Sequence, residues 1–225
     1  MMHNPIIDYP RFFVNWIKNR FNPDIKSLQQ CYMATVARSE IGENVKVYPH
    51  AAVGHSSIGS HSYIGPASKV RHTSIGKFCS IGANCIIGAG QHPIEYVSTS
   101  PSFYSISSGP THHFSDKEYF TPYKPINIGN DVWIGDSVVV MGGITIADGA
   151  IVGARAVVTR DVPSYSIYGG IPAKFIRYRF PKNIRDFLLK IRWWEQDDRW
   201  LRENFKFFHD VEAFRTFVEN DNALN

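Results

Sequence analysis

The stretch 58-IGSHSYIGPASKVRHTSIGKFCSIGANCIIG-88 places an aliphatic residue at every fifth or sixth position, and glycine follows most of these residues. In this half of the chain the aliphatic positions are 41, 47, 53, 58, 64, 70, 75, 81 and 87, so three steps make a 17-residue unit. The pattern resumes at 128 and continues at 134, 140, 146, 152 and 158, where three steps make an 18-residue unit. A fixed internal period is typical of repeat architectures. Three short strands per turn, joined by tight corners, would produce these units.

The residues at the expected corners give a second test of the repeat. The fourth residue after each aliphatic position is mostly small in the first half, as a narrow prism-shaped interior requires; these residues are Val45, Ala51, Ser57, Ser62, Ser68, Ser74, Cys79 and Cys85. Glycine after the aliphatic residue suits a corner where a Cβ would crowd or φ must be positive. An antiparallel sandwich would instead show period-two alternation and hairpin turns such as Asn-Gly, and neither occurs. The sequence therefore predicts an all-β solenoid, a parallel β-helix.

Three segments are expected along the chain. An N-terminal arm or helix takes residues 1–34, the β-helix takes 35–168, and a C-terminal turn with helices takes 169–225. The repeat is interrupted at 89–125, where prolines, serines and aromatic residues indicate an ordered loop. Loops of this length inside a compact repeat are usually functional. We therefore expect the chemistry in this loop.

The two flanking segments have helical patterns. In residues 10–22, bracketed by two prolines, the aromatic and aliphatic residues fall near one face; they are Phe12, Phe13, Trp16, Ile17 and Phe21. We expect this helix to pack on the first coil, with adhesion to a membrane surface as the alternative. Residues 181–220 predict one or two amphipathic helices from the spacing of Ile184, Phe187, Leu188, Ile191, Trp194 and Leu201.

Composition excludes several classes of protein. The 225 residues carry a net charge of +4 and no basic block with interleaved aromatics, so nucleic acid is not suggested. There is no run of 18 apolar residues and no basic leader with an apolar core, so neither a membrane span nor a secretory signal is expected. Cys79 and Cys85 are expected to pack in the interior of a protein in a reducing compartment, which predicts a cytoplasmic location.

Histidines offer a possible metal site. His55 and His72 are 17 residues apart and should stack on adjacent turns, with His50 nearby. Such a set would bind zinc only if a neighbouring subunit completed it. Solvated or interface histidines are the alternative, and we expect no metal.

The chain resembles the hexapeptide-repeat acyltransferases over roughly residues 41–195. The similarity rests on the repeat, on Gln91-His92-Pro93 in the loop, on the segment IGNDVWIGDSVVVMGGITIADGAIVGARAVVTRDVP and on the closing GGIPAKFIR. The branch it most resembles is the xenobiotic acetyltransferase type, which includes chloramphenicol and streptogramin acetyltransferases and sugar O-acetyltransferases of surface polysaccharides. The resemblance implies a left-handed β-helix, a homotrimer with active sites between subunits, and acetyl-CoA as cosubstrate.

The resemblance also assigns residues. His92 matches the family's catalytic histidine, and a neutral imidazole near pH 7 suits deprotonation of an attacking hydroxyl. His112 and His113 are rivals on the same loop, and Glu95 is a candidate to orient the imidazole. The cofactor positions implied are Asp136, Ala154, Thr159, Arg160, Lys174 and Arg177, the last two beside the phosphates, where cations are expected on charge alone. Related sugar acetyltransferases often have Ser where this chain has Asp136.

Several functions stay open at this point. The first expectation is direct acetyl transfer from acetyl-CoA to a sugar hydroxyl, in polysaccharide biosynthesis. Acetylation of an antibiotic such as chloramphenicol and N-acetylation of an amino-sugar nucleotide would use the same base. A metal-dependent carbonic anhydrase on this fold would need three convergent histidines and no basic pair at Lys174 and Arg177. A trimeric scaffold without activity would not need His92.

Overall fold

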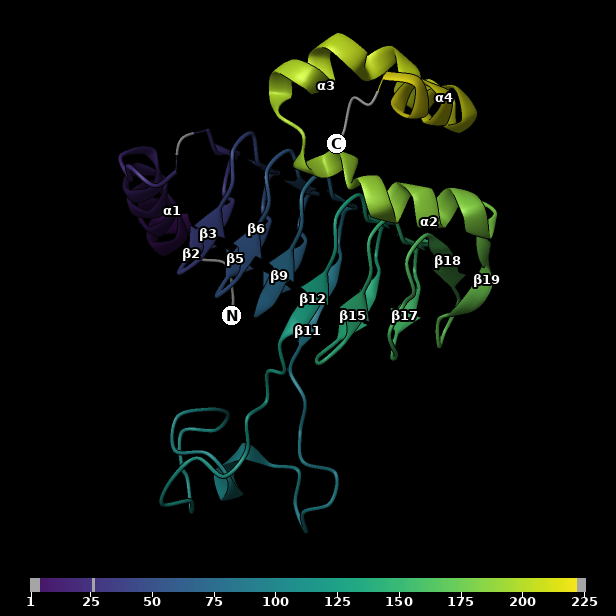
Figure 1. Cartoon of the computed structure of the whole chain (residues 1–225). Helices are drawn as coiled ribbons and strands as arrows, with labels where there is room; N and C mark the ends of the chain where they lie inside the picture. Colours follow the sequence, from purple (N-terminus) through teal and green to yellow (C-terminus); the bar gives the residue numbers. More distant parts are fainter. Residues whose placement is uncertain (1–4, 26, 222–225) are drawn as a thin grey trace.

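The chain folds into a parallel β-helix of three sheets, as the repeat predicts, and the helix is left-handed, as the family resemblance implies. Figure 1 shows the short strands stacked along one axis, with α1 at the first turn and the C-terminal helices running back along one side of the stack. The computed structural model describes residues 5–25 and 27–221. The predictions made for residues 1–4, 26 and 222–225 lie outside the described residues.

Each sheet takes one strand from each turn. Sheet A runs in the order β1 (Gln29–Gln30), β4 (Lys46–Val47), β7 (Tyr63–Ile64), β10 (Ser80–Ile81), β13 (Trp133–Ile134), β16 (Ile151–Val152), β18 (Ser166–Gly169) and β19 (Lys174–Tyr178), which pairs antiparallel. Sheet B contains β2 (Thr35–Ala37), β5 (Ala52–Gly54), β8 (Lys69–Arg71), β11 (Ile86–Ala89), β14 (Val139–Met141) and β17 (Val157–Val158). Sheet C contains β3 (Glu40–Ile41), β6 (Ser57–Ile58), β9 (Thr73–Ile75), β12 (Ile126–Ile128) and β15 (Thr145–Ile146).

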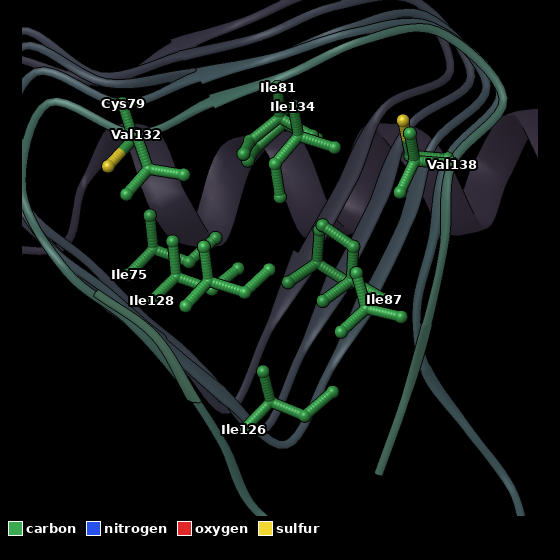
Figure 2. Packing of buried hydrophobic residues seen from close by; sticks show 14 of the residues in the cluster. Ile75, Cys79, Ile81, Ile87, Ile126, Ile128, Val132, Ile134 and Val138 are labelled. Atoms are coloured by element: carbon green, nitrogen blue, oxygen red, sulfur yellow. The ribbon is translucent and has the colours of Figure 1, made fainter. Parts of the chain in front are cut away.

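The aliphatic repeat is the core of the coil. Ile58 pairs with Ile75, and Ile75 pairs with Ile128 on the far side of the loop, so the interruption leaves the register unchanged. Figure 2 shows Ile75 next to Ile128 inside the coil, and Ile81 next to its strand partner Ile134. Because a strand has a side-chain period of two, a two-residue strand of the repeat points one aliphatic residue inward, and the three-residue strand β12 points both Ile126 and Ile128 inward.

The corner prediction is wrong at Ser57 and Ser74. The structure buries Ser56 and Thr73 instead, while the Ser57 hydroxyl donates to that of Ser74 outside the interior. The reason is the five-residue step from sheet B to sheet C in the first half. The buried corner residue always lies two positions before the next aliphatic residue of the repeat, whether the step to that residue is five or six positions long. For six-residue steps this is the fourth residue after the previous one, and Ser62, Ser68, Cys79 and Cys85 are buried as expected.

Glycine is required at the corners by crowding. A Cβ on Gly65 would lie 2.5 Å from the carbonyl carbon of Gly82 in the next turn, inside any real contact distance. The positive φ of the same corner falls two residues later, on Ala67. The repeat therefore uses glycine for close approach of successive turns, while other residues take the left-handed conformation.

The two interior cysteines pack as expected. The Cys79 thiol donates to the Gly129 carbonyl oxygen at 3.0 Å and the Cys85 thiol to that of Gly135 at 3.2 Å. Burial raises the pKa of Cys79 to about 12. A thiol of this kind stays protonated near neutral pH and does not act as a nucleophile.

Helix α1 (Pro5–Arg20) covers the open edge of sheet B at the first turn. The helix begins earlier than predicted, and Pro10 lies inside it. Pro10 removes one backbone donor near the start of the helix, and side-chain contacts farther along still hold α1 on the coil. Asn15 bonds both the backbone N–H and the carbonyl oxygen of Val36, which have no strand partner on that side.

The C-terminal region contains more short helices than the one or two expected. They are α2 (Lys182–Ile191), the 3₁₀ turn η2 (Trp193–Glu195), α3 (Asp198–Asn204), the 3₁₀ turn η3 (Phe205–His209) and α4 (Val211–Asp221). They fold back over the corner between sheets C and A. There His61 contacts Asp198 at 2.8 Å, and the ring of Phe78 lies 5.0 Å from that of Trp193. Within the described residues, no helix is long and apolar enough to cross a bilayer.

Candidate active site

The 89–125 loop leaves the coil at the corner between sheets B and C, from β11 to β12. Figure 1 shows it extending well away from the coil. At its base the Gln91 backbone N–H donates to the Pro122 carbonyl oxygen at 2.8 Å, and the Gln91 side chain reaches the Gly142 carbonyl oxygen at 3.2 Å. Gly142 lies at the same corner one turn later, so these bonds tie the base of the loop to the coil.

Tyr104 is the centre of the loop's own packing. Its ring is 2% exposed and meets the rings of Tyr96 and Phe120 edge-on, with centroids 6.4 and 5.5 Å away. Such edge-to-face pairs stabilise aromatic clusters beyond the area they bury. Tyr104 follows a short 3₁₀ turn η1 (Pro101–Phe103), which Ser100 caps. The aromatic residues that marked the loop in the sequence are thus its small core.

A carboxylate fixes the outer part of the loop. Glu118 accepts hydrogen bonds from the hydroxyls of Ser105 and Ser107 and from the backbone N–H of Ile106, at 2.8 to 3.1 Å. These bonds favour the charged form, with that from Ser107 the largest cause, and they lower the pKa of Glu118. The loop is therefore an ordered unit.

His92 is held at one ring nitrogen. Its Nδ1 lies 2.8 Å from the Thr99 carbonyl oxygen and 2.9 Å from the Tyr104 hydroxyl. A carbonyl oxygen can only accept a hydrogen bond, whereas a hydroxyl can accept or donate. Both contacts are favourable together when Nδ1 carries the proton and donates to both oxygens. This arrangement leaves the Nε2 lone pair free, which is the form a general base needs.

The imidazole lines a groove of about 670 Å³. The groove runs along the loop base from Gly90 to Tyr96 and also touches Phe120, Lys124 and Met141. A base with a free ring nitrogen therefore lies where a small acceptor can enter. Neither His112 nor His113 lines this groove. His112 packs against the ring of Phe114, and the His113 Nδ1 is buried without a hydrogen-bond partner among the described residues.

Glu95 does not orient the imidazole in this arrangement. It lines the same groove, but the Nδ1 contacts go to Thr99 and Tyr104, and no hydrogen bond joins Glu95 to His92 in the described part of the chain. The fold of the loop brings Thr99 and Tyr104, seven and twelve positions along the chain, to the imidazole of His92. Sequence spacing alone offered no guide to either contact.

Two of the expected cofactor residues lie at a different corner from His92. Asp136 and Ala154 follow β13 and β16, so they lie at the corner between sheets A and B, one turn apart. The Arg155 backbone N–H donates to the Asp136 carbonyl oxygen, which joins these two turns. The loop leaves from the corner between B and C, at the other end of the short strand β14. A single chain does not bring these residues to the His92 groove.

The Asp136 side chain has a structural contact. Its Oδ1 accepts the Ala83 backbone N–H of the preceding turn at 2.7 Å. Ser60 and Asn130 occupy the same place in their turns, at the corner between C and A, and bond the N–H groups of Glu43 and Lys77 in the same way. Asp136 thus belongs to a set of polar side chains that join successive turns, and Ser at this position would make the same bond, as Ser60 does.

The remaining expected residues are all exposed. Thr159 and Arg160 follow β17 at the B–C corner, on the same side of the coil as the loop exit. Lys174 and Arg177 lie on β19, the antiparallel strand that closes sheet A. The Arg177 guanidinium contacts only the Tyr178 carbonyl oxygen at 3.0 Å among the described residues, so its charge stays available to an anionic ligand.

The predicted histidine stack exists, without the third histidine. The rings of His55 and His72 are parallel at 5.0 Å, and Tyr123 of the loop extends the stack at 4.9 Å. His50 lies at the A–B corner and packs edge-on against Tyr32. The three histidines therefore do not converge within one chain, and no group of three metal-binding side chains occurs among the described residues.

Three groups at the site were missed by sequence reasoning. Tyr104 and the Thr99 carbonyl hold the imidazole, and Lys124 adds a cation to the groove wall. A tyrosine in an aromatic-rich loop carries no mark of such a contact, and a backbone carbonyl carries none at all. Of the three, only Lys124 could have been suggested by the sequence, because it lies at the end of the loop, next to the point where the coil resumes.

Comparisons with known proteins agree on the kind of fold. The family described as bacterial transferase hexapeptide (six repeats) matches residues 125–160. A chloramphenicol acetyltransferase of Agrobacterium fabrum is 45% identical over 121 residues, which cover 52% of this chain and 57% of that protein. A probable macrolide acetyltransferase of Lysinibacillus sphaericus is 38% identical over 133 residues, which cover 58% of this chain and 73% of that protein.

A solved structure matches a larger part of the chain at lower identity. It is a mutant of AntD, an N-acyltransferase from Bacillus cereus, in complex with dTDP and coenzyme A. The match has a TM-score of 0.59 and 20% identity, and covers 78% of this chain and 95% of that one. At this identity the likeness concerns the fold. The match to the Agrobacterium fabrum protein spans little more than half of that relative.

Proposed function

Because this chain belongs to the hexapeptide-repeat acyltransferases, in the branch of the chloramphenicol acetyltransferases, we propose that it transfers an acetyl group from acetyl-CoA to an acceptor hydroxyl. The observation that carries the proposal is that His92 lines a groove while its imidazole is anchored through Nδ1, which leaves Nε2 as the nitrogen that can accept a proton. The acceptor we propose is a sugar of a surface polysaccharide. Acetyl-CoA is a cytoplasmic metabolite, so the proposal includes a cytoplasmic location.

The reaction needs one base and no acyl-enzyme. His92 Nε2 takes the hydroxyl proton as the acceptor oxygen attacks the thioester carbon, and the new C–O bond forms as the C–S bond breaks. The proton on Nε2 then passes to the departing thiolate. The Thr99 and Tyr104 oxygens accept from Nδ1–H and stabilise the imidazolium during transfer.

The chain offers cations and backbone for acetyl-CoA, which supplies the acetyl thioester. Lys174 and Arg177 are exposed on β19, and Arg160 is exposed at the loop's own corner, so all three fit phosphate groups. Because the Asp136 side chain already bonds Ala83, we assign its part in cofactor binding to the backbone at the A–B corner, with Ala154 one turn further along that corner. Thr159 would bind the cofactor from the B–C corner, beside Arg160.

The separation of the corners supports a shared site in a homotrimer. The C–A corner is covered by the C-terminal helices, His92 extends from the B–C corner, and Asp136 and Ala154 lie at the A–B corner. A neighbouring copy would bring its A–B corner against the loop of the first.

The assembly can be tested by mixing two inactive or weakened variants. In co-expressed chains carrying either His92→Ala or the pair Lys174→Ala and Arg177→Ala, activity at low acetyl-CoA should exceed that of either parent. No gain in the mixture would place the site within one chain.

The groove supports a hydroxylated acceptor. Its wall combines polar groups, including Gln91, Glu95 and Lys124, with the rings of Tyr96 and Phe120, a mixture that suits the polar edges and apolar faces of sugars. An antibiotic acceptor is the second candidate, favoured by the identity to chloramphenicol and macrolide acetyltransferases. An amino-sugar nucleotide would need the same base.

An acceptor screen tests the proposal. Purified protein is incubated with acetyl-CoA and, separately, with sugars, sugar nucleotides, amino sugars, chloramphenicol and macrolides, while free thiol is followed. Acceptor-dependent thiol release that disappears in His92→Ala is expected. If thiol release is absent with every acceptor and acetyl-CoA does not bind, the proposed activity is wrong.

A further inference from the structure

Helix α1 packs on the coil with its polar side. The contacts to the coil come from Asn15, Asn19 and Phe12, which recur at helical spacing. The two asparagines bond the Val36 backbone at 2.8 to 3.1 Å, and Asn19 also reaches the Gln30 side chain at 2.8 Å. A surface helix of a globular protein normally does the reverse and buries its apolar side.

The apolar side of α1 is therefore exposed. Phe13 is 51% exposed, Trp16 and Ile17 are each 37% exposed, and Phe21, just after the helix, is 79% exposed. The rings of Phe13 and Trp16 stack on each other at 6.2 Å, and Trp16 also borders a small cavity with Ile25 and Leu28. Val14 extends the same face and is 52% exposed. Tyr9 borders it and is 53% exposed, although its ring also contacts Tyr32 of the coil at 6.3 Å. A contiguous exposed face of this kind marks an interaction surface.

Three cations lie beside this face, and Asp8 in the first turn is the acidic residue of the helix. Arg11, Lys18 and Arg20 are exposed, and none of them forms an ion pair with another described residue. Long cationic side chains at the border of an apolar face can extend to anionic headgroups while their stems stay on the apolar surface. Trp16 and Tyr9 are the residue types that favour the boundary between water and lipid.

The position of α1 leaves this face accessible. The helix covers the edge of β2, the first strand of sheet B, so its exposed side looks away from the end of the coil. The faces of the three sheets and the 89–125 loop lie elsewhere. Contact at this end would leave the His92 groove open.

We propose that the exposed face of α1, formed by Tyr9, Phe13, Val14, Trp16, Ile17 and Phe21 with Arg11, Lys18 and Arg20 beside it, docks the protein on an anionic lipid bilayer. The helix would lie in the plane of the interface with its apolar face among the headgroups. The inference goes beyond the proposed acetyl transfer and does not depend on it.

Vesicle sedimentation tests this docking without acetyl-CoA. Wild-type protein is mixed with phosphatidylcholine vesicles that contain 0 or about 30% phosphatidylglycerol, a range that spans neutral and anionic surfaces. Binding to the anionic vesicles, reduced by salt, is expected. The variant Phe13→Ser with Trp16→Ser should bind at least about tenfold more weakly. The variant Lys18→Glu with Arg20→Glu should lose roughly fivefold per charge removed.

A matched control lies at the other end of the chain. Phe205 is 52% exposed and is followed by Lys206, and Phe205→Ser should bind vesicles like the wild type. Unchanged thermal melting of the α1 variants would exclude unfolding as the cause of weaker binding. The proposal fails if the wild type does not bind anionic vesicles, or if the control loses binding equally. It also fails if the Phe13 and Trp16 variant lowers the mass in light scattering, since a second copy would then cover this face.

Discussion

The Tyr104 hydroxyl lies 2.9 Å from His92 Nδ1, although twelve residues separate the two in the chain. The tyrosine ring is buried in the small core of the loop, while the imidazole lines the groove. The packing of the loop therefore sets the orientation of the proposed base. This relationship links the aromatic composition of the loop to its chemistry.

Replacing His92 with alanine should lower acetyl transfer by at least about a hundredfold, because a positioned general base contributes about that much or more. His112→Ala is the matched control on the same loop and should stay within about twofold, since His112 lies outside the groove. Steady-state rates with the acceptor found in the screen decide this. Near-normal turnover of the His92 variant would remove it from the role of base.

Tyr104→Phe should lower kcat by about fivefold, the rate equivalent of one hydrogen bond worth about 1 kcal/mol. The ring that packs against Tyr96 and Phe120 is kept, so the KM for acetyl-CoA and the melting temperature should not change. Tyr104→Ala removes the ring as well and should also destabilise the loop. If Tyr104→Phe raised the KM for acetyl-CoA by as much as it lowered kcat, the result would argue against a positioning role for this hydroxyl.

Replacing Lys174 and Arg177 together with alanine should weaken acetyl-CoA binding at least tenfold, because charge-assisted bonds are each worth about 1.5–3 kcal/mol. The effect should shrink at high salt, where exposed charges are screened. Lys182→Ala is the control, since that exposed lysine pairs with Asp186 on α2. Calorimetric titration measures the affinity, and unchanged binding would refute the phosphate assignment.

Cys79 should make folding sensitive to alkaline pH. Burial raises the pKa of Cys79 from 9.0 in its ordinary state to about 12 in the folded protein. The unfolded chain then loses the thiol proton before the folded one, so stability is full below pH 9 and falls as pH rises towards 12. Cys79→Ala should lose less stability over this range. Denaturant titrations at pH 8 and pH 10.5 compare the two, and parallel losses would contradict the shift.

Asn15→Ala should leave the Val36 N–H without a partner on the open edge of sheet B. The expected cost is about 1–3 kcal/mol, the penalty for an unsatisfied backbone donor. Hydrogen exchange at the Val36 amide should accelerate in this variant. Asn19→Ala is the comparison, because of the two Val36 backbone groups Asn19 bonds the carbonyl oxygen and not the N–H, so the N–H bond to Asn15 stays in place. Equal acceleration in both variants would mean that α1 detaches as a whole.

The sequence by itself determined the coil. One aliphatic residue per short strand and one glycine per close approach repeat locally, so their spacing carries the fold, the register across the loop and the position of the interruption. Within the coil, the predicted corner residues were wrong at Ser57 and Ser74, where a five-residue step shifts the interior position by one.

Only the tertiary structure decided how His92 is held, which corner each expected cofactor residue occupies and which side of α1 faces the coil. The Thr99 and Tyr104 contacts depend on how an irregular loop closes on itself, and such closure has no periodicity to read. The orientation of α1 was decided by the unpaired backbone groups of Val36, which asparagine side chains can satisfy and apolar ones cannot. Hydrogen bonding at a strand edge thus outweighed the burial of an apolar face.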